Sequence, residues 1–203
     1  MAIVNPLRRQ CALGCLILTL GSFPPILPVT DADWTIERLM ILVREQRKPS
    51  VAFEEATYSS VLTESLKVRG ILRFIPPATL EKLVTDPHHE RYVIQGDRVT
   101  FESQRKGITR TLSLGEYPAL RSFVEAFRMS LMGEDAELKQ LYEVTLDGTP
   151  ANWALLLRPL DPAGKSVVDY LLFTGSDGRI GTIAVRSPDG DRTVMRLLWG
   201  ASR

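Results

Sequence analysis

Short segments in which apolar and polar residues alternate follow one another along the first half of the chain. Between residues 70 and 75, Leu72 and Phe74 occupy every second position, and apolar residues resume after Pro76 and Pro77. A period of two residues places alternate side chains on one face of a β-strand. The strands predicted from this pattern are residues 51–61, 67–75, 79–85, 91–94, 99–103 and 108–114.

A helical pattern interrupts these strands at residues 115–133. Its large apolar residues recur at intervals of three and four, which places them on one face of a helix. Pro118 suits the first turn, and Gly133 suits the left-handed position that follows a helix. Residues 134–142 predict a second, short helix.

Another helix is predicted at residues 34–46, before the first strand. Apolar residues again recur at helical spacing, Asp33 is the expected N-cap, and Pro49 stops the helix. After the second helical region the strand pattern returns, with glycine, aspartate and proline in the separators. The later predicted strands are residues 142–146, 153–160, 167–174, 180–186 and 193–199.

These elements predict a mainly β fold with a few helices. Short connections between consecutive strands require antiparallel neighbours. A flat sheet of about eleven strands is unusual, so we expect the sheet to curl. Several strands are apolar on both faces, and the helix at residues 115–133 is the obvious cover for one of them. The result is an incomplete antiparallel β-barrel of about eleven strands with a helical lid.

The N-terminal segment has the three regions of an export signal. A short basic stretch contains Arg8 and Arg9, an apolar stretch follows, and Ala32 offers a small residue for cleavage. We therefore expect residues 1–32 to be a signal peptide and residues 33–203 to form a single domain. A membrane anchor is the alternative, and a lipoprotein signal ending at Cys15 fits less well because Cys15 follows Arg9 too soon.

Composition after cleavage favours the bacterial periplasm. Both cysteines, Cys11 and Cys15, lie in the removed segment, so no disulfide is expected in the mature chain. Its basic and acidic residues balance, and this neutrality argues against a nucleic-acid partner.

The mature chain offers little reactive chemistry. His88 and His89 are adjacent, so on an extended chain they point to opposite sides and do not share a metal easily. The sequence holds no nucleophile elbow, phosphate-binding loop or dinucleotide glycine pattern. We therefore expect no enzymatic activity, cofactor or metal. The basic turn at Arg105 and Lys106 is interpreted as a solvated turn, with a docking patch for an acidic partner as the alternative.

The order and spacing of several stretches resemble those of the periplasmic outer-membrane lipoprotein carriers, the LolA-like family, in its LolA-related branch. The resemblance runs from about Trp34 to Leu198. It is carried by "FEEATYSSVL", "GILRFIPPATLEKLV", "VIQGDRVTF", "LYEVTLDGTPANWALLLRPLD", "SDGRIGTIAV" and "DGDRTVM". It implies a periplasmic monomer whose apolar cavity takes acyl chains of lipoproteins or other lipid-like cargo. The implied partners are an inner-membrane donor complex and an outer-membrane acceptor.

The expected cavity lining combines one part of the sheet with the lid. For any single residue, an ordinary place in the core is the simpler interpretation, because buried apolar residues are the rule. The residues predicted to contact cargo are Leu72, Phe74 and Leu80 from the sheet, and Leu120, Phe123, Val124, Phe127 and Leu131 from the lid helix.

Two departures from the resembled family bear on the cargo. Typical members carry an Arg-Pro pair whose arginine helps to fasten the lid, whereas Pro76–Pro77 stands here, and Arg73 is the possible substitute. Typical members also continue beyond the last strand. These departures allow another lipid-like cargo, such as an acylated or polyene-type product. The alternative functions are a docking or accessory module of a lipid or pigment synthesis and export complex and, ranked last, a lipid-ester hydrolase.

Overall fold

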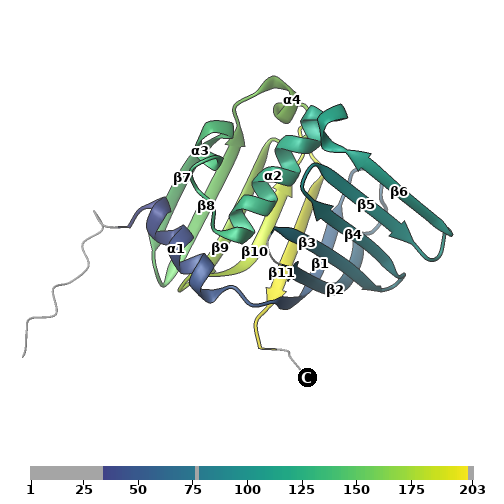
Figure 1. Ribbon diagram of the computed structural model, residues 1–203, viewed down its shortest axis with the longest axis horizontal. Helices are drawn as coiled ribbons and strands as arrows, with labels where there is room; N and C mark the ends of the chain where they lie inside the picture. The colour runs from purple at the N-terminus through teal and green to yellow at the C-terminus, as the bar shows by residue number, and fades with distance from the viewer. Residues whose placement is uncertain (1–33, 76–77, 201–203) are drawn as a thin grey trace, which may run out of the picture.

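The computed structural model describes residues 34–75 and 78–200 (Figure 1). Its strands are β1 (Ser50–Tyr58), β2 (Leu66–Ile75), β3 (Thr79–Asp86), β4 (Glu90–Gln95), β5 (Arg98–Ser103), β6 (Ile108–Ser113), β7 (Tyr142–Thr149), β8 (Asn152–Pro159), β9 (Tyr170–Ser176), β10 (Arg179–Arg186) and β11 (Arg192–Leu198). Its helices are α1 (Ile36–Gln46), the 3₁₀ turn η2 (Leu114–Glu116), α2 (Pro118–Met132), α3 (Leu138–Leu141) and α4 (Pro162–Lys165).

All these strands form one antiparallel sheet, in the order β6-β5-β4-β3-β2-β1-β11-β10-β9-β8-β7. The first six strands therefore form one half of the sheet and the last five the other, and the two halves meet where β1 pairs with β11. Strands β6 and β7 are its two free edges, so the sheet is not closed into a barrel. It curls around α2, which lies on its inner face (Figure 1). The predicted incomplete barrel with a helical lid is confirmed.

Tight turns give the sheet its register. Gly96 and Asp97 connect β4 to β5, and Gly96 has a φ of 54°, in the left-handed region that glycine adopts readily. Strand β2 ends at Ile75 and β3 begins at Thr79, which pairs with it, so the chain reverses within a few residues. Prolines cannot donate hydrogen bonds to a ladder, which suits a corner. Pro76 and Pro77 themselves lie outside the described residues.

Helices α1 and α2 lie close to their predicted positions, whereas the short helix predicted at residues 134–142 is only the single turn α3, Leu138–Leu141. Helix α2 starts at Pro118 and ends at Met132, and Gly133, whose φ of 74° is left-handed, follows it as the predicted cap. The predicted N-cap of α1 at Asp33 is replaced by Thr35, whose side-chain oxygen accepts a hydrogen bond from the Arg38 N–H at 3.4 Å. This correction moves the cap two residues along, because Thr35 directly precedes the first helical residue.

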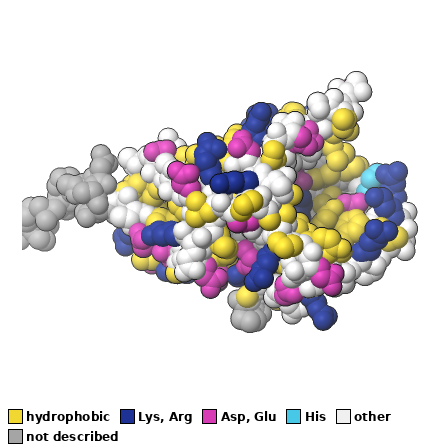
Figure 2. Space-filling model, turned by 90° about the horizontal axis from the view of Figure 1, so that it is seen from above, with side chains coloured by type: hydrophobic (Ala, Val, Ile, Leu, Met, Phe, Trp, Pro, Cys, Tyr) yellow, Lys and Arg dark blue, Asp and Glu magenta, His cyan; other side chains and the backbone are white. Residues whose placement is uncertain are grey.

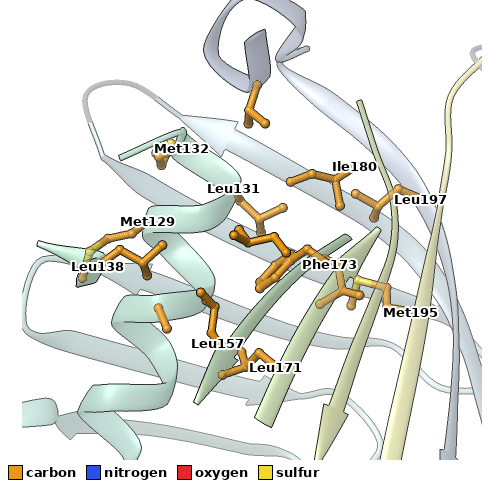
Figure 3. Packing of buried hydrophobic residues seen from close by; sticks show 14 of the residues in the cluster. Met129, Leu131, Met132, Leu138, Leu157, Leu171, Phe173, Ile180, Met195 and Leu197 are labelled. Carbon is orange, nitrogen blue, oxygen red and sulfur yellow. The ribbon is translucent and has the colours of Figure 1, made fainter. Parts of the chain in front are cut away.

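The main core lies between α2 and the inner faces of the strands behind it. In Figure 3, Leu131 of α2 lies on the side of the helix that faces the strands, with Phe173, Ile180, Met195 and Leu197, whereas Met129 lies on the other side of the helix beside Leu138. Helix α1 adds its own apolar face, formed by Ile36, Leu39, Met40 and Val43. Within the described residues, no helix has both the length and the apolar character needed to span a membrane. The predicted signal peptide, residues 1–32, lies outside the described residues.

Candidate functional site: the inner face of the sheet

Pairing register decides which side chains share the inner face of the sheet. Phe53 of β1 lies opposite Gly70 of β2 and Leu197 of β11. Gly70 allows a close approach, because a Cβ at this position would lie 1.9 Å from the Leu83 carbonyl oxygen. Since side chains two residues apart point the same way, the inner face can be followed from strand to strand.

The predicted sheet residues Leu72, Phe74 and Leu80 all belong to this inner face. They are 0 %, 8 % and 1 % exposed, respectively, and form part of the main core. In this arrangement all three pack among other apolar side chains of the core, and their contact with cargo stays a prediction.

The predicted lid residues divide into two groups. Val124 and Leu131 are buried in the core, whereas Leu120, Phe123 and Phe127 are only half-buried. The rings of Phe123 and Phe127 lie side by side, with centroids 6.1 Å apart. The three half-buried residues follow one another at intervals of three and four, so they form one stripe along α2.

The structure brings Phe74 and Leu131 together at one end of the lid. A void of about 10 Å³ lies between them, and Val43, Ile180, Leu197 and Trp199 also line it. A volume of this size corresponds to about one water molecule. The space beneath the C-terminal end of α2 is therefore filled by side chains and holds no acyl chain without movement of the helix.

The inner face of β4 to β6 is different, because its apolar side chains are not fully covered. Tyr92, Ile94, Val99 and Phe101 are half-buried, and Leu112 is exposed. Helix α2 crosses the sheet beside these strands rather than over them (Figure 1). Figure 2 shows the same side of the molecule hollowed and lined with hydrophobic side chains. We call this surface the open trough.

An ion pair lies on the inner face at the side of the trough. Lys82 Nζ lies 2.7 Å from the Glu55 carboxylate, and both side chains are largely buried. The same ammonium group is 5.4 Å from the Phe53 ring centroid and 5.7 Å from that of Tyr92. These are cation–π distances, and they hold the charge between aromatic rings.

Tyr92 adds a second polar contact beside the Lys82–Glu55 ion pair. Its hydroxyl donates to the Glu90 carboxylate at 3.0 Å, and burial, followed by this hydrogen bond, raises the pKa of the phenol. The hydroxyl therefore stays protonated and remains a hydrogen-bond donor at physiological pH. Sequence analysis missed Glu55, Lys82 and Glu90 as inner-face residues, although each is two or four positions from an apolar residue of that face.

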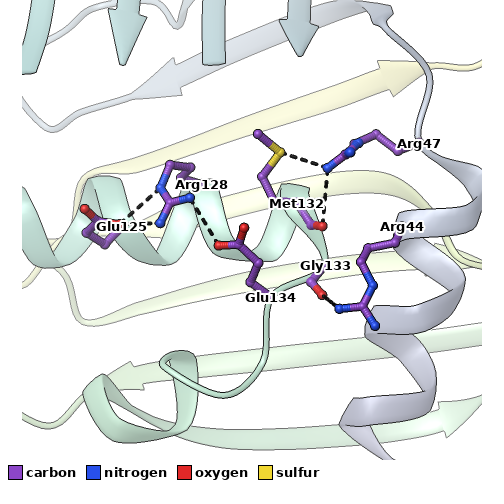
Figure 4. Close-up of polar contacts among 7 residues, drawn as sticks. All are labelled: Arg44, Arg47, Glu125, Arg128, Met132, Gly133 and Glu134. Atoms are coloured by element: carbon purple, nitrogen blue, oxygen red, sulfur yellow. Dashed lines mark hydrogen bonds and ion pairs between the residues drawn. The ribbon is translucent and has the colours of Figure 1, made fainter. Parts of the chain in front are cut away.

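Arg44 of α1 and Arg47, which directly follows this helix, hold the C-terminal end of the lid (Figure 4). Arg44 Nη1 donates to the Gly133 carbonyl oxygen at 3.1 Å. Arg47 Nη1 contacts both the carbonyl oxygen of Met132, at 3.5 Å, and its sulfur, at 3.0 Å. We call these contacts the lid latch. They satisfy carbonyl groups that the end of a helix leaves without intrahelical partners.

Arg73, the residue considered as a substitute lid fastener, lies elsewhere. It projects from the outer face of β2 and donates to Glu81 at 3.1 Å. The observed latch comes from Arg44 and Arg47 instead. Among the described residues, no group of three or more metal-binding side chains is present.

The N-terminal end of α2 is held by a carboxylate. Asp161 accepts from the Ser122 hydroxyl at 3.1 Å and from the Gly164 N–H at 2.7 Å. The Gly164 hydrogen bond is the main cause of a lowered pKa at Asp161, so this carboxylate stays ionised at neutral pH. Both ends of the lid thus have polar attachments, while its middle rests on apolar packing.

Comparison with curated proteins found no match. Among solved structures, a LolA superfamily protein from Nitrosomonas europaea is 12% identical, with a TM-score of 0.41, covering 81% of this chain and 92% of that one. A putative outer membrane lipoprotein-sorting protein domain from Vibrio parahaemolyticus is 9% identical, with a TM-score of 0.40, covering 83% and 95%. The Pseudomonas aeruginosa MucA/MucB complex contains a chain that is 8% identical, with a TM-score of 0.40, covering 80% and 55%.

The family comparison covers most of the sequence. A family model described as outer membrane lipoprotein carrier protein LolA-like matches residues 27–203. The match includes every described strand and helix, as well as the lid latch and the open trough. The chain therefore belongs to the LolA-like outer membrane lipoprotein carrier family.

Proposed function

We propose that this protein is a periplasmic carrier that binds acyl chains of lipoproteins or related lipids and moves them from the inner toward the outer membrane. The observation that carries the proposal is the open trough, an apolar surface that adjoins a separately attached lid helix. The residue pattern of the N-terminal segment and the family membership support export and a carrier role.

Acyl binding fits the chemistry of the trough. Each methylene group moved from water into an apolar site gains about 0.8 kcal/mol. Ile94, Val99 and Phe101 provide such a site without a change of the backbone, because their side chains already face the trough. Displacement of α2 would add the stripe of Leu120, Phe123 and Phe127 and then the buried residues beneath it.

The lid arrangement fits release as well as capture. Helix α2 has polar contacts at its two ends, and few of these must break to move it. Lid motions of this kind occur on microsecond to millisecond timescales in other proteins. A donor or acceptor complex that competed for Arg44 and Arg47 would open the lid without unfolding the sheet.

A binding assay with two matched variants tests the proposal. We expect a fluorescent fatty acid to bind the protein and Ile94→Gln to weaken its affinity about tenfold, since Ile94 would lose most of its apolar contact with the chain. Val93→Gln is the control, because Val93 is the half-buried neighbour on the opposite face of β4. Native mass spectrometry of gently purified protein should also show bound lipid.

Absence of lipid, together with no fatty-acid binding, would reject the carrier function. Equal weakening by both substitutions would place the ligand outside the trough. The second candidate is a docking or accessory module of a lipid or pigment synthesis and export complex. The filled space beneath α2 favours it, since a module without cargo needs no cavity. This candidate predicts complex formation that survives Ile94→Gln.

A further inference from the structure

The connection between β1 and β2 projects apolar side chains into solvent. Val61 is 87 % exposed, and Leu62, Leu66 and Tyr58 are also exposed. The turn is formed by hydrogen bonds from the Leu62 N–H to the Ser59 carbonyl, at 3.1 Å, and from the Val61 N–H to the Ser59 hydroxyl, at 3.4 Å. These apolar side chains therefore stand on a built turn rather than on a loose segment.

Basic side chains gather on the outer face of the sheet at the base of this hairpin. A groove of about 680 Å³ on the outer face of β2, β1 and β11 is lined by Lys67, Arg69, Arg192 and Arg196. Tyr58 connects the apolar tip to the basic groove, because the Arg192 guanidinium lies 4.7 Å from the centroid of the Tyr58 ring. The groove and the apolar tip thus form one continuous surface.

Acidic residues only partly neutralise the positive charge of the groove. Asp86 pairs with Arg69 at 3.1 Å, and Glu54 lies opposite Arg196 in the register. Glu55, whose carboxylate bonds Lys82 on the other face, contributes little charge here. Four cationic side chains therefore face two carboxylates, and the groove keeps a net positive charge.

The neighbouring turns extend this basic surface. Successive antiparallel strands return the β3–β4 and β5–β6 turns to the same end of the sheet as the β1–β2 hairpin. His88 and Arg105, one from each turn, lie 2.7 Å apart, and Lys106 is beside them. Figure 2 shows a histidine among Lys and Arg side chains at this margin.

We propose that this end of the molecule docks onto an anionic lipid surface. Val61 and Leu62 enter the boundary between headgroups and acyl chains, while Lys67, Arg69 and Arg192 contact lipid phosphates. An apolar tip with cations around its base is the combination that interfacial binding requires. An acidic protein would use the cations but leave the exposed Val61 unexplained, which favours lipid over protein as the occupant.

Docking of this kind would bring the open trough close to the membrane that supplies its acyl chains. That consequence rests on the proposed function, whereas docking itself does not. The two are separable, since the hairpin lies outside the trough. Variants of the hairpin should bind a fluorescent fatty acid in solution as the unchanged protein does.

Vesicle flotation tests the docking proposal. We expect the protein to bind vesicles of phosphatidylethanolamine and phosphatidylglycerol, and Val61→Ser with Leu62→Ser to lower the partition coefficient about tenfold or more. Ile75→Ser with Leu198→Ser is the matched control, because both are exposed apolar residues at the opposite end of the sheet. It should leave binding unchanged.

The charge contribution is measured in the same assay. Replacing Lys67 and Arg192 by Gln should each weaken binding to the anionic vesicles about fivefold, and neither should affect binding to neutral phosphatidylcholine. Every variant keeps the same N-terminal segment, so differences between variants report on the hairpin and its base.

A local probe completes the test. Leu62→Trp should show a blue-shifted emission on anionic vesicles and quenching by brominated lipid, after subtraction of the unchanged protein's signal. Unquenched Leu62→Trp emission, or equal partition of the serine variants and the unchanged protein, would overturn the proposal. Loss of vesicle binding with unchanged fatty-acid affinity would support docking and leave the carrier function intact.

Discussion

The two halves of the sheet have the same alternation of apolar and polar residues, but their inner faces are covered to different extents. In β8 to β11, the inner-face residues Leu155, Phe173 and Met195 are buried under α2. In β4 and β5, the equivalent inner-face residues Tyr92 and Phe101 remain half-buried in the open trough. The difference comes from the cover and not from the strands, because α2 lies over the middle of the sheet and not over β4 to β6. The covered strands thus contribute stability, and β4 to β6 keep apolar surface available.

The strands at and beside the open trough carry a network of ion pairs on their outer face, which compensates for the incomplete apolar cover of the inner face. Glu81 of β3 has a side chain only 5% exposed and pairs with Arg73 and Arg91, and Arg91 also pairs with Glu102. This outer ion network ties β2, β3, β4 and β5 together where the inner face lacks a full apolar cover.

The largest expected effect is a difference in unfolding free energy between substitutions in the covered core and in the open trough. Phe173→Ala should cost about 4 kcal/mol of unfolding free energy, because the cavity lies in a fully covered core. Phe101→Ala should cost about 1 kcal/mol, since its ring is already partly solvated. Urea denaturation followed by circular dichroism measures both. Equal losses would mean that the trough is as tightly packed as the core.

A smaller effect is expected from the outer ion network. Glu81→Gln should cost about 2 kcal/mol at pH 7, since charged hydrogen bonds to two arginines are lost from a buried position. Glu102→Gln is the control. Its carboxylate is 39% exposed, so its loss should matter little. Similar losses for the two variants would remove the special role of Glu81.

The pH dependence follows from the same carboxylate. Burial alone would raise the pKa of Glu81, but hydrogen bonds from Arg91 and Arg73 outweigh it, and the pKa lies below its ordinary value. A lowered folded-state pKa gives stability that is present above the unfolded-state pKa and is lost as the pH falls through the folded one. Unfolding free energies measured from pH 7 down to pH 3 should therefore fall less steeply for Glu81→Gln.

The smallest effect concerns the lid, which belongs to the covered half. Replacing both Arg44 and Arg47 by Gln should cost about 1 kcal/mol and speed amide hydrogen exchange in α2 more than in β9. Arg38→Gln, an exposed change on the same helix, should alter neither quantity. Unchanged exchange in α2 would show that apolar packing alone holds the lid.

Much of the fold was predictable because alternation and turn chemistry are local properties. Alternation located the two strands that the Gly96–Asp97 turn connects, and Pro118 with Gly133 bounded α2. The short helix α4 was missed, since its Pro, Gly and Lys residues are equally typical of a turn. The cap at Thr35 was missed because Asp33 and Thr35 are both good N-caps and the choice depends on where the helix begins.

The candidate site was less predictable, because it depends on which residues meet. Period two assigns Leu72 and Ile94 to faces, but it does not say which of them α2 covers. Lys82 and Glu55 are far apart along the chain, and only the β1–β2–β3 register brings them together. The lid latch likewise joins α1 to the end of α2, which no local pattern encodes.

The strand order has a mechanical consequence for the whole molecule. The sheet's two halves are hydrogen-bonded along the β1–β11 seam, while the backbone passes from one half to the other through the segment that contains α2. The lid is therefore also the tether between the two free edges. Flexing of the sheet about the seam would change the span this tether must bridge. A partner that bound either edge strand and flexed the sheet would therefore displace the lid without contacting α2.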